Sequence, residues 1–399
     1  MSAERLFELA RHLTERDREV ALYLYRHRML TTDQLQLLFF SSRRRAQDRL
    51  LFLYRNRVLD RFYPSAPFGS GKPEAHWLLD EAGAILVAAM HDLERKRLGW
   101  QRRDDWGSHP QLAHQLETNR FVTDLIAATL ADPGLGVSEW WSPAEAADRL
   151  SQERRGRVLP DAGFYLETPV GPIECYLEWD RATEMLERLA EKLLGYRLAE
   201  ARLYGEASEP RCILFVVPGD RRLETLRRAY GDFERERERR SSRGSLRSLD
   251  GRWPVLASTT IRLRASGPLG AVWERLDLET ARLLALTDLP ARRDMKSADL
   301  SRTLGRRWRN DDADFWRRLS PLGAGRQSAT EEGSEITSQA ADPEAEAFIA
   351  RLPRLREAEL HEARRDAAAL SSANPDLDLR SSAINGSMDD REDDVEEQL

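Results

Sequence analysis

The chain is poor in cysteine and has no long apolar run. Its 399 residues include two cysteines, Cys175 and Cys212, which excludes a disulfide scaffold and a multi-cysteine zinc site. No stretch of about 18 apolar residues occurs, so a membrane-spanning helix is not expected. The first residues also lack the apolar stretch of a signal peptide. The sequence therefore predicts a cytoplasmic protein without a membrane partner.

Other catalytic patterns are also missing. The seven histidines show neither an HExxH pair nor a cysteine partner at ligand spacing, so a zinc site is not expected. No G-x-S-x-G motif occurs, which argues against a serine hydrolase. A strand-nicking relaxase combines a nucleophilic tyrosine with a three-histidine metal site, and the scattered histidines do not fit that arrangement.

Lysine is scarce and the charge is unevenly distributed. Only four of the 62 basic residues are lysines, so the position of an arginine carries more information than the number of arginines. The net charge is −6, but residues 328–399 hold 7 basic and 19 acidic residues and residues 1–327 are net positive by 6. A basic body favours a polyanionic partner, with which an acidic tail can compete.

Residues 1–100 are predicted to form a helical unit followed by a hairpin. Thr14 with Asp17 three positions later is typical of a capping box, and Thr32 and Ser42 precede two further helices. Two short strands joined by a glycine-containing loop follow. This order of helix, short helix, turn, longer helix and two-stranded wing predicts a winged helix-turn-helix.

The third helix of this unit begins with three consecutive arginines. Cations in a first helical turn oppose the helix dipole and are unfavourable by a few tenths of a kcal/mol each, so folding stability does not explain them. A recognition helix in the major groove does, because its first residues reach bases and phosphates. The alternative is a helical hairpin that docks on protein. The predicted DNA-contacting residues are Arg43, Arg44, Arg45, Gln47, Arg49 and, in the wing, Lys72.

Residues 110–285 alternate helix and strand, which predicts an α/β domain and, with the helical unit, an α+β or α/β multidomain chain. Glu178 and Asp180 fall on one face of a predicted strand, roughly 7 Å apart by the rise of a strand. Asp161 on the preceding strand can meet them across a hairpin. Such carboxylates repel one another unless arginines, water or a divalent cation such as Mg²⁺ relieve them.

A stretch around this hairpin resembles the replication-relaxation family of mobile elements. The resemblance spans about residues 10–275 and rests mainly on PDA at 160–162 and LEWDRATE at 177–184, followed by a helix with Lys192 and Tyr196. It implies an association with plasmid replication or conjugative mobilisation.

The central unit also resembles the PD-(D/E)xK nuclease fold. This resemblance implies that Asp161 and Glu178 bind a metal ion, with Glu117 as an additional acidic ligand. Asp180 stands where the lysine is expected, so Lys192 on the next helix is the candidate for a migrated lysine. The implied catalytic residues are Asp161, Glu178, Asp180 and Lys192, and the implied metal ligands are Asp161, Glu178, Asp180 and Glu117. Without the lysine, the fold binds DNA and does not cut it.

Residues 286–327 are predicted to form a linker, and the composition of residues 328–399 favours disorder. Together these features predict a DNA-binding accessory protein of plasmid or integrative-element replication or mobilisation, without catalytic activity. The alternatives are a metal-dependent DNA endonuclease and a winged-helix transcriptional regulator or protein-interaction module. Double-stranded DNA is the expected partner, a relaxase or replication protein is a candidate partner, and Mg²⁺ is the one cofactor suggested.

Overall fold

The computed structural model describes residues 3–64, 73–91, 98, 100, 111–150, 158–182, 186–203, 211–240, 253–278, 282–292 and 295–309. The predictions for Lys72, for the second half of the linker and for the acidic tail at 328–399 lie outside these residues. The chain divides into two compact units. The larger takes in residues 13–87 and the described residues from 100 to 309, and the smaller includes helix α1 (Ala3–His12).

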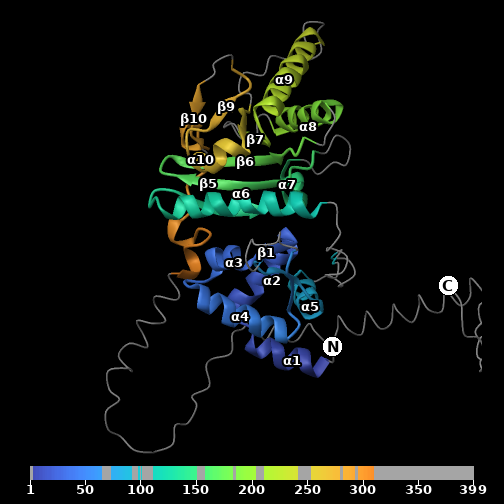
Figure 1. Ribbon diagram of the computed structural model, residues 1–399, viewed down its shortest axis with the longest axis vertical. Coiled ribbons are helices and arrows are strands. Elements are labelled where there is room, and N and C mark those ends of the chain that lie inside the picture. The colour runs from blue at the N-terminus through green and yellow to red at the C-terminus, as the bar shows by residue number, and fades with distance from the viewer. Residues whose placement is uncertain are drawn as a thin grey trace, which may run out of the picture. The chain divides into compact units, whose positions relative to one another are not determined.

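The first part of the larger unit combines helices with a small sheet (Figure 1). The sheet has three antiparallel strands in the order β1-β3-β2. The elements in chain order are α2 (Glu15–His27), β1 (Met29–Thr31), α3 (Thr32–Phe39), α4 (Arg43–Arg55), β2 (Leu59–Phe62), β3 (His76–Leu79) and α5 (Glu81–Met90).

Capping boxes define where the first two of these helices begin. The Thr14 hydroxyl accepts from the Asp17 backbone N–H, and the Asp17 carboxylate accepts from the Thr14 N–H at 2.7 Å, as the sequence predicts. At α3 the cap is Thr31 rather than Thr32, because Thr31 and Gln34 exchange the same pair of bonds. Thr32 lies inside the helix, and its hydroxyl accepts from the Trp77 indole N–H at 2.9 Å.

A seven-stranded sheet forms the rest of the larger unit, in the order β10-β9-β8-β7-β6-β5-β4. Strands β6, β7 and β8 run parallel and the other neighbours are antiparallel. The predicted mixture of helix and strand is confirmed, and so is the β5–β6 hairpin. The elements are α6 (Leu112–Leu130), β4 (Gly136–Trp141), α7 (Pro143–Leu150), β5 (Ala162–Thr168), β6 (Gly171–Trp179), α8 (Leu186–Leu203), β7 (Cys212–Val217), α9 (Asp220–Arg240), β8 (Val255–Thr259), α10 (Thr260–Ser266), β9 (Trp273–Arg275) and β10 (Leu283–Leu284).

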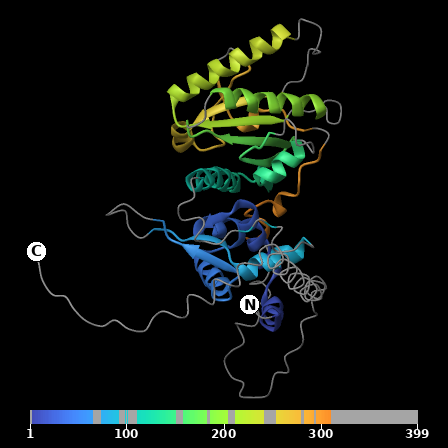
Figure 2. The same ribbon diagram turned by 90° about the vertical axis from the view of Figure 1, so that its right-hand side faces the viewer.

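Helices cover both faces of this sheet. Helix α6 lies along one face, and α8 and α9 lie along the other (Figures 1 and 2). On the first face Phe121 of α6 packs against Phe164 and Trp179. On the second, Tyr176 of β6 packs near Tyr196 of α8. Both faces of β5 and β6 are therefore buried. None of the described helices combines the length and the apolar character needed to cross a bilayer.

The segment from 295 to 309, which falls in the predicted linker, makes specific contacts. The Arg306 guanidinium donates to three backbone carbonyls at and after the end of α6. Arg307 forms ion pairs with Glu15 and Glu19 of α2, both at 2.6 Å. Residues 300–309 of this segment, here called the strap, therefore join α2 to the connection between α6 and β4.

Candidate functional site

Helix α4 presents one buried face and one exposed face. Ser42 caps the helix, since its hydroxyl accepts from the Arg45 backbone N–H at 3.4 Å, as predicted. Ala46, Leu50 and Leu53 are fully buried. The helical period then leaves the positions between them, beginning in the first turn, to point away from the core.

The predicted DNA-contacting residues are not equally placed on this exposed face. Arg44 is 93% exposed and lies 3.9 Å from Asp48, and Gln47 one turn later is also exposed. Arg43 forms an ion pair with Asp33 of α3. Arg45 donates to the Ser41 hydroxyl at 2.8 Å. Among the described members of the set, Arg44 and Gln47 are thus exposed positions one turn apart on this face of α4.

Arg49 makes contacts within the chain that the sequence did not predict. Its Nε donates to an Asp17 carboxylate oxygen at 2.8 Å, and a second guanidinium nitrogen pairs with the other oxygen. The Asp17 carboxylate is fully buried, and the guanidinium also lies over the Phe52 ring, 4.3 Å from its centroid. Arg49 therefore fixes α4 to α2. A buried carboxylate needs such a partner.

A basic residue that the sequence analysis did not single out lies at the base of the predicted wing. Arg61 of β2 places its guanidinium 4.7 Å from the centroid of the Tyr54 ring, 5.5 Å from that of Trp77 and 5.6 Å from that of Tyr63. Tyr63 is 44% exposed. The aromatic pair Phe62-Tyr63 directly after Arg61 is the signal that could have identified this group.

The second candidate site lies where β5 begins and β6 ends. Asp161 directly precedes β5, and its backbone N–H donates to the Leu177 carbonyl at 2.9 Å. One carboxylate oxygen accepts from the Trp179 backbone N–H at 2.7 Å. The other lies 2.8 Å from Nε2 of His114 on α6. Both oxygens of Asp161 therefore have partners within the chain.

Glu178 of β6 is bound in the same way from the opposite face of the sheet. Its side chain is 1% exposed, and one oxygen lies 2.8 Å from Nζ of Lys192. The other oxygen accepts from the Tyr196 hydroxyl at 2.6 Å. Lys192 and Tyr196 are one helical turn apart on α8. The lysine that the resemblance marks as a migrated residue thus reaches Glu178.

These groups influence one another electrostatically. Burial raises the pKa of Glu178 to about 7, although the Lys192 ammonium opposes the shift, and the Asp161 charge adds to it. Burial lowers the pKa of His114, but the hydrogen bond and charge of Asp161 outweigh it, so the net pKa is raised. Asp161, Glu178, His114 and Lys192, here called the carboxylate cluster, therefore behave as one site.

Asp180 and Glu117 do not join the carboxylate cluster. Strand β6 ends at Trp179, so the alternation that would place Asp180 beside Glu178 stops one residue too early. The Asp180 carboxylate instead accepts from Arg222 of α9 at 2.6 Å. Glu117 accepts from the Trp179 indole N–H at 3.1 Å and pairs with Arg181 at 3.3 Å.

The arrangement does not fit the Mg²⁺ ion that the nuclease resemblance implies. Mg²⁺ needs an octahedral shell of oxygen ligands, whereas all four oxygens of Asp161 and Glu178 already accept from donors of the chain. Within the described residues, no group of three or more His, Cys, Asp or Glu side chains is placed to hold a metal ion.

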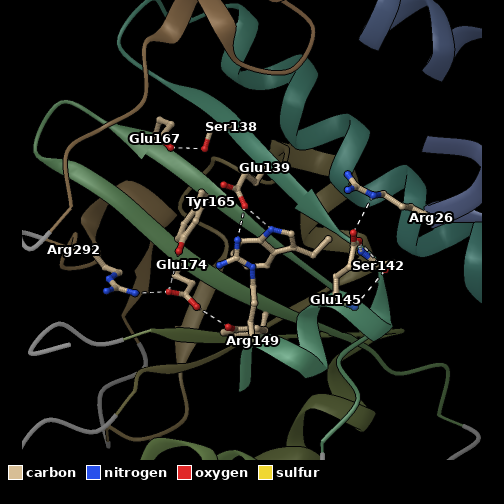
Figure 3. A network of polar contacts seen from close by, with 12 residues as sticks. Arg26, Ser138, Glu139, Ser142, Glu145, Arg149, Tyr165, Glu167, Glu174 and Arg292 are labelled. Carbon is tan, nitrogen blue, oxygen red and sulfur yellow. Dashed lines mark hydrogen bonds and ion pairs between the residues drawn. The ribbon is translucent and has the colours of Figure 1, made fainter. Parts of the chain in front are cut away.

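Glu174, a second buried glutamate on β6, has its charge neutralised by two arginines. Glu174 lies four residues before Glu178 and accepts from Arg211 at 2.8 Å and from Arg292 at 2.6 Å (Figure 3 shows the Arg292 pair). Burial raises the pKa of Glu174, but the Arg211 charge and the hydrogen bonds lower it by more, so the net pKa is below its usual value. Glu174 is therefore a structural ion-pair centre.

His114 is the member of the carboxylate cluster that the sequence analysis missed. It lies 47 residues before Asp161, and no local pattern joins the two. The available signal is its position one turn before Glu117 on α6, because residues three apart share a helix face. Tyr196 was noted only as part of the family pattern, and its hydroxyl proves to bind Glu178.

A model of the replication-relaxation family matches residues 22–207 of the chain. This range includes α4 and every member of the carboxylate cluster. Searches of curated proteins and of solved structures gave no significant match.

Proposed function

Because the chain belongs to the replication-relaxation family, we propose that it is a DNA-binding accessory protein of plasmid or integrative-element replication or mobilisation, without catalytic activity. Family membership supports the role in replication or mobilisation. Double-stranded DNA is the proposed ligand, and a relaxase or replication protein is the proposed protein partner.

The observation that carries the proposal is the exposed first turn of α4. Arg44 is exposed in this turn and Gln47 is exposed one turn later, while Arg43 pairs with Asp33 and Arg45 donates to Ser41. The element order α2, β1, α3, α4, β2, β3 with a three-stranded antiparallel sheet supports the interpretation as a winged helix-turn-helix. In that architecture the helix after the turn enters the major groove with its first residues toward the bases.

The carboxylate cluster supports the non-catalytic part of the proposal. Asp161 directly before β5 and Glu178 on the neighbouring β6, with Lys192 reaching Glu178 from the next helix, support a nuclease-like core. The carboxylate oxygens, however, are already bound by donors of the chain. A nuclease needs those oxygens to hold its metal ion and attacking water, so we favour a fold that retains the framework of a nuclease without the reaction.

The test is duplex binding by Arg44→Ala, measured by fluorescence anisotropy over a series of salt concentrations. Arg120→Ala is the matched control, because Arg120 on α6 is 79% exposed and lies 3.8 Å from Asp124 four residues later, much as Arg44 lies beside Asp48. We expect Arg44→Ala to weaken binding roughly tenfold and to lower the salt slope by about one, while Arg120→Ala changes neither.

Two results would contradict the proposal. If the wild-type chain has no affinity for duplex DNA at low salt, the chain is not a DNA-binding protein. If Arg44→Ala and Arg120→Ala have equal effects, DNA is bound elsewhere than at α4.

A further inference from the structure

We propose that His114 and Lys192 are internal substitutes for a divalent metal ion at Asp161 and Glu178. This inference deepens the non-catalytic part of the proposed function and is independent of DNA contact by α4. The two basic side chains hold the two carboxylates where β5 begins and β6 ends. In a metal-dependent site the metal ion holds the carboxylates instead.

The two carboxylates have the same kinds of hydrogen-bond partners. Asp161 has His114 at 2.8 Å on one oxygen and the Trp179 backbone N–H at 2.7 Å on the other. Glu178 has Lys192 at 2.8 Å on one oxygen and the Tyr196 hydroxyl at 2.6 Å on the other. Each carboxylate thus has one basic partner and one neutral donor. A metal ion at this place would have to share each carboxylate with these donors, one of which in each set is a basic side chain.

The two basic partners come from opposite sides of the sheet. His114 lies on α6, which covers one face, and Lys192 lies on α8, which covers the other (Figure 1). They therefore connect α6 to Asp161, directly before β5, and α8 to Glu178, near the end of β6. Side chains of the chain itself give this connection without any dissolved ion.

Charge also opposes a metal ion at this point. The Lys192 ammonium is 2.8 Å from a Glu178 carboxylate whose side chain is 1% exposed. A divalent cation placed on the same carboxylate would meet that ammonium in a region of low dielectric constant, where like charges repel strongly. Conversely, loss of the two basic side chains would leave two carboxylates to repel each other, and such a pair attracts a cation.

The first experiment measures Mn²⁺ binding to the full-length wild-type chain without DNA, by electron paramagnetic resonance and by thermal unfolding. We expect no bound Mn²⁺ and an unchanged melting temperature with Mg²⁺ or Mn²⁺ present. Binding of Mn²⁺ to the wild type that Glu178→Gln abolishes would overturn the proposal, whatever the result of the DNA-binding test.

The second experiment uses the double variant His114→Ala/Lys192→Ala. We expect it to gain a Mn²⁺ site that a further Glu178→Gln change removes. Arg211→Ala is the matched control, because it takes one cation from Glu174 on the same strand but leaves Arg292 and Tyr176 in place. This control should bind no Mn²⁺.

A folded double variant that binds no Mn²⁺ would also overturn the proposal. The two carboxylates would then have no affinity for a divalent cation even without His114 and Lys192. Circular dichroism decides whether the variant is folded. Where it is not folded, Lys192→Met alone, which keeps an unbranched side chain at this position, replaces it with the same expected result. The wild-type measurement also tests the inference by itself.

Discussion

The imidazole ring of His27 stacks on the indole ring of Trp140, with the ring centroids 3.6 Å apart and the planes inclined by 17°. His27 ends α2, and Trp140 lies on β4, an edge strand of the seven-stranded sheet. Beside them Asn119 of α6 donates to the backbone carbonyls of both His27 and Met29. Buried contacts therefore join α2 and β1 to α6 and to the seven-stranded sheet.

The His27 stack predicts a loss of stability in acid. Burial holds the pKa of His27 well below its usual value, and the nearby Arg26 charge lowers it further. The unfolded chain therefore takes up a proton near pH 6.5 that the folded chain refuses, so the free energy of unfolding falls as the pH drops below about 6.5. His27→Phe keeps a ring on Trp140 and removes the titration.

Urea denaturation near pH 7.5 and near pH 5.5 measures the effect. The wild type should lose about 1 kcal/mol more than His27→Phe between the two conditions. The comparison isolates His27, since the other histidines titrate in both chains. Equal losses in the two chains would show that the stack does not depend on a neutral imidazole.

Asn119 should be a point of large destabilisation. Its amide donates to two buried carbonyls, His27 O at 3.0 Å and Met29 O at 2.7 Å. Asn119→Ala leaves both carbonyls without this donor, and we expect a loss of about 2 kcal/mol in the free energy of unfolding. The adjacent exposed change Arg120→Ala should stay within about 0.5 kcal/mol of the wild type. A loss at Asn119 as small as that at Arg120 would contradict the assigned role.

Local patterns predicted the parts of this structure that depend on neighbours in the chain. The capping box at Thr14, the cap at Ser42 and the β5–β6 hairpin all follow from residues within a few positions of one another. The exception is α3, where two adjacent threonines offered the same signal and the helix begins one residue earlier. The burial of both faces of β6 was not foreseen, because alternation in the sequence suggested one polar face.

Partners of long charged side chains could not be predicted in the same way. The Arg49 pair with Asp17 spans 32 residues, and the Asp180 pair with Arg222 spans 42. Which of several acidic groups an arginine meets depends on how helices are packed, and the sequence contains many of each. The position of Glu178 opposite Lys192 was among the alternatives because the helix directly follows the strand.

Arg49 and Arg44 should have opposite phenotypes although both lie on α4. Arg49→Ala leaves the fully buried Asp17 carboxylate without its guanidinium partner, and removal of one member of a buried pair destabilises by roughly 3 kcal/mol. Arg44→Ala removes an exposed side chain and should change stability by less than about 0.5 kcal/mol. Denaturation and duplex binding of the two variants measure both effects. Strong destabilisation by Arg44→Ala would contradict its placement.

The acidic tail at 328–399 should weaken DNA binding. It has a net charge of −12, whereas the rest of the chain is net positive by 6, so the tail competes with phosphate for the basic surface. A truncation after residue 327 keeps the strap, whose Arg306 and Arg307 bind α6 and α2, and it removes none of the described residues. The truncated chain should bind duplex DNA several-fold more tightly at low salt, and the difference should shrink as salt screens the charges.

A full-length variant in which every Asp and Glu of the tail is changed to Asn or Gln separates charge from bulk. If charge is the cause, this variant should bind as tightly as the truncated chain, because it has lost the carboxylate charges of the tail but kept its length. If it binds like the wild type while the truncated chain binds more tightly, the tail acts by occupying space. Equal affinities and salt slopes in all three chains would mean that the tail does not reach the DNA-binding surface, and its acidic character would then have to serve a protein partner.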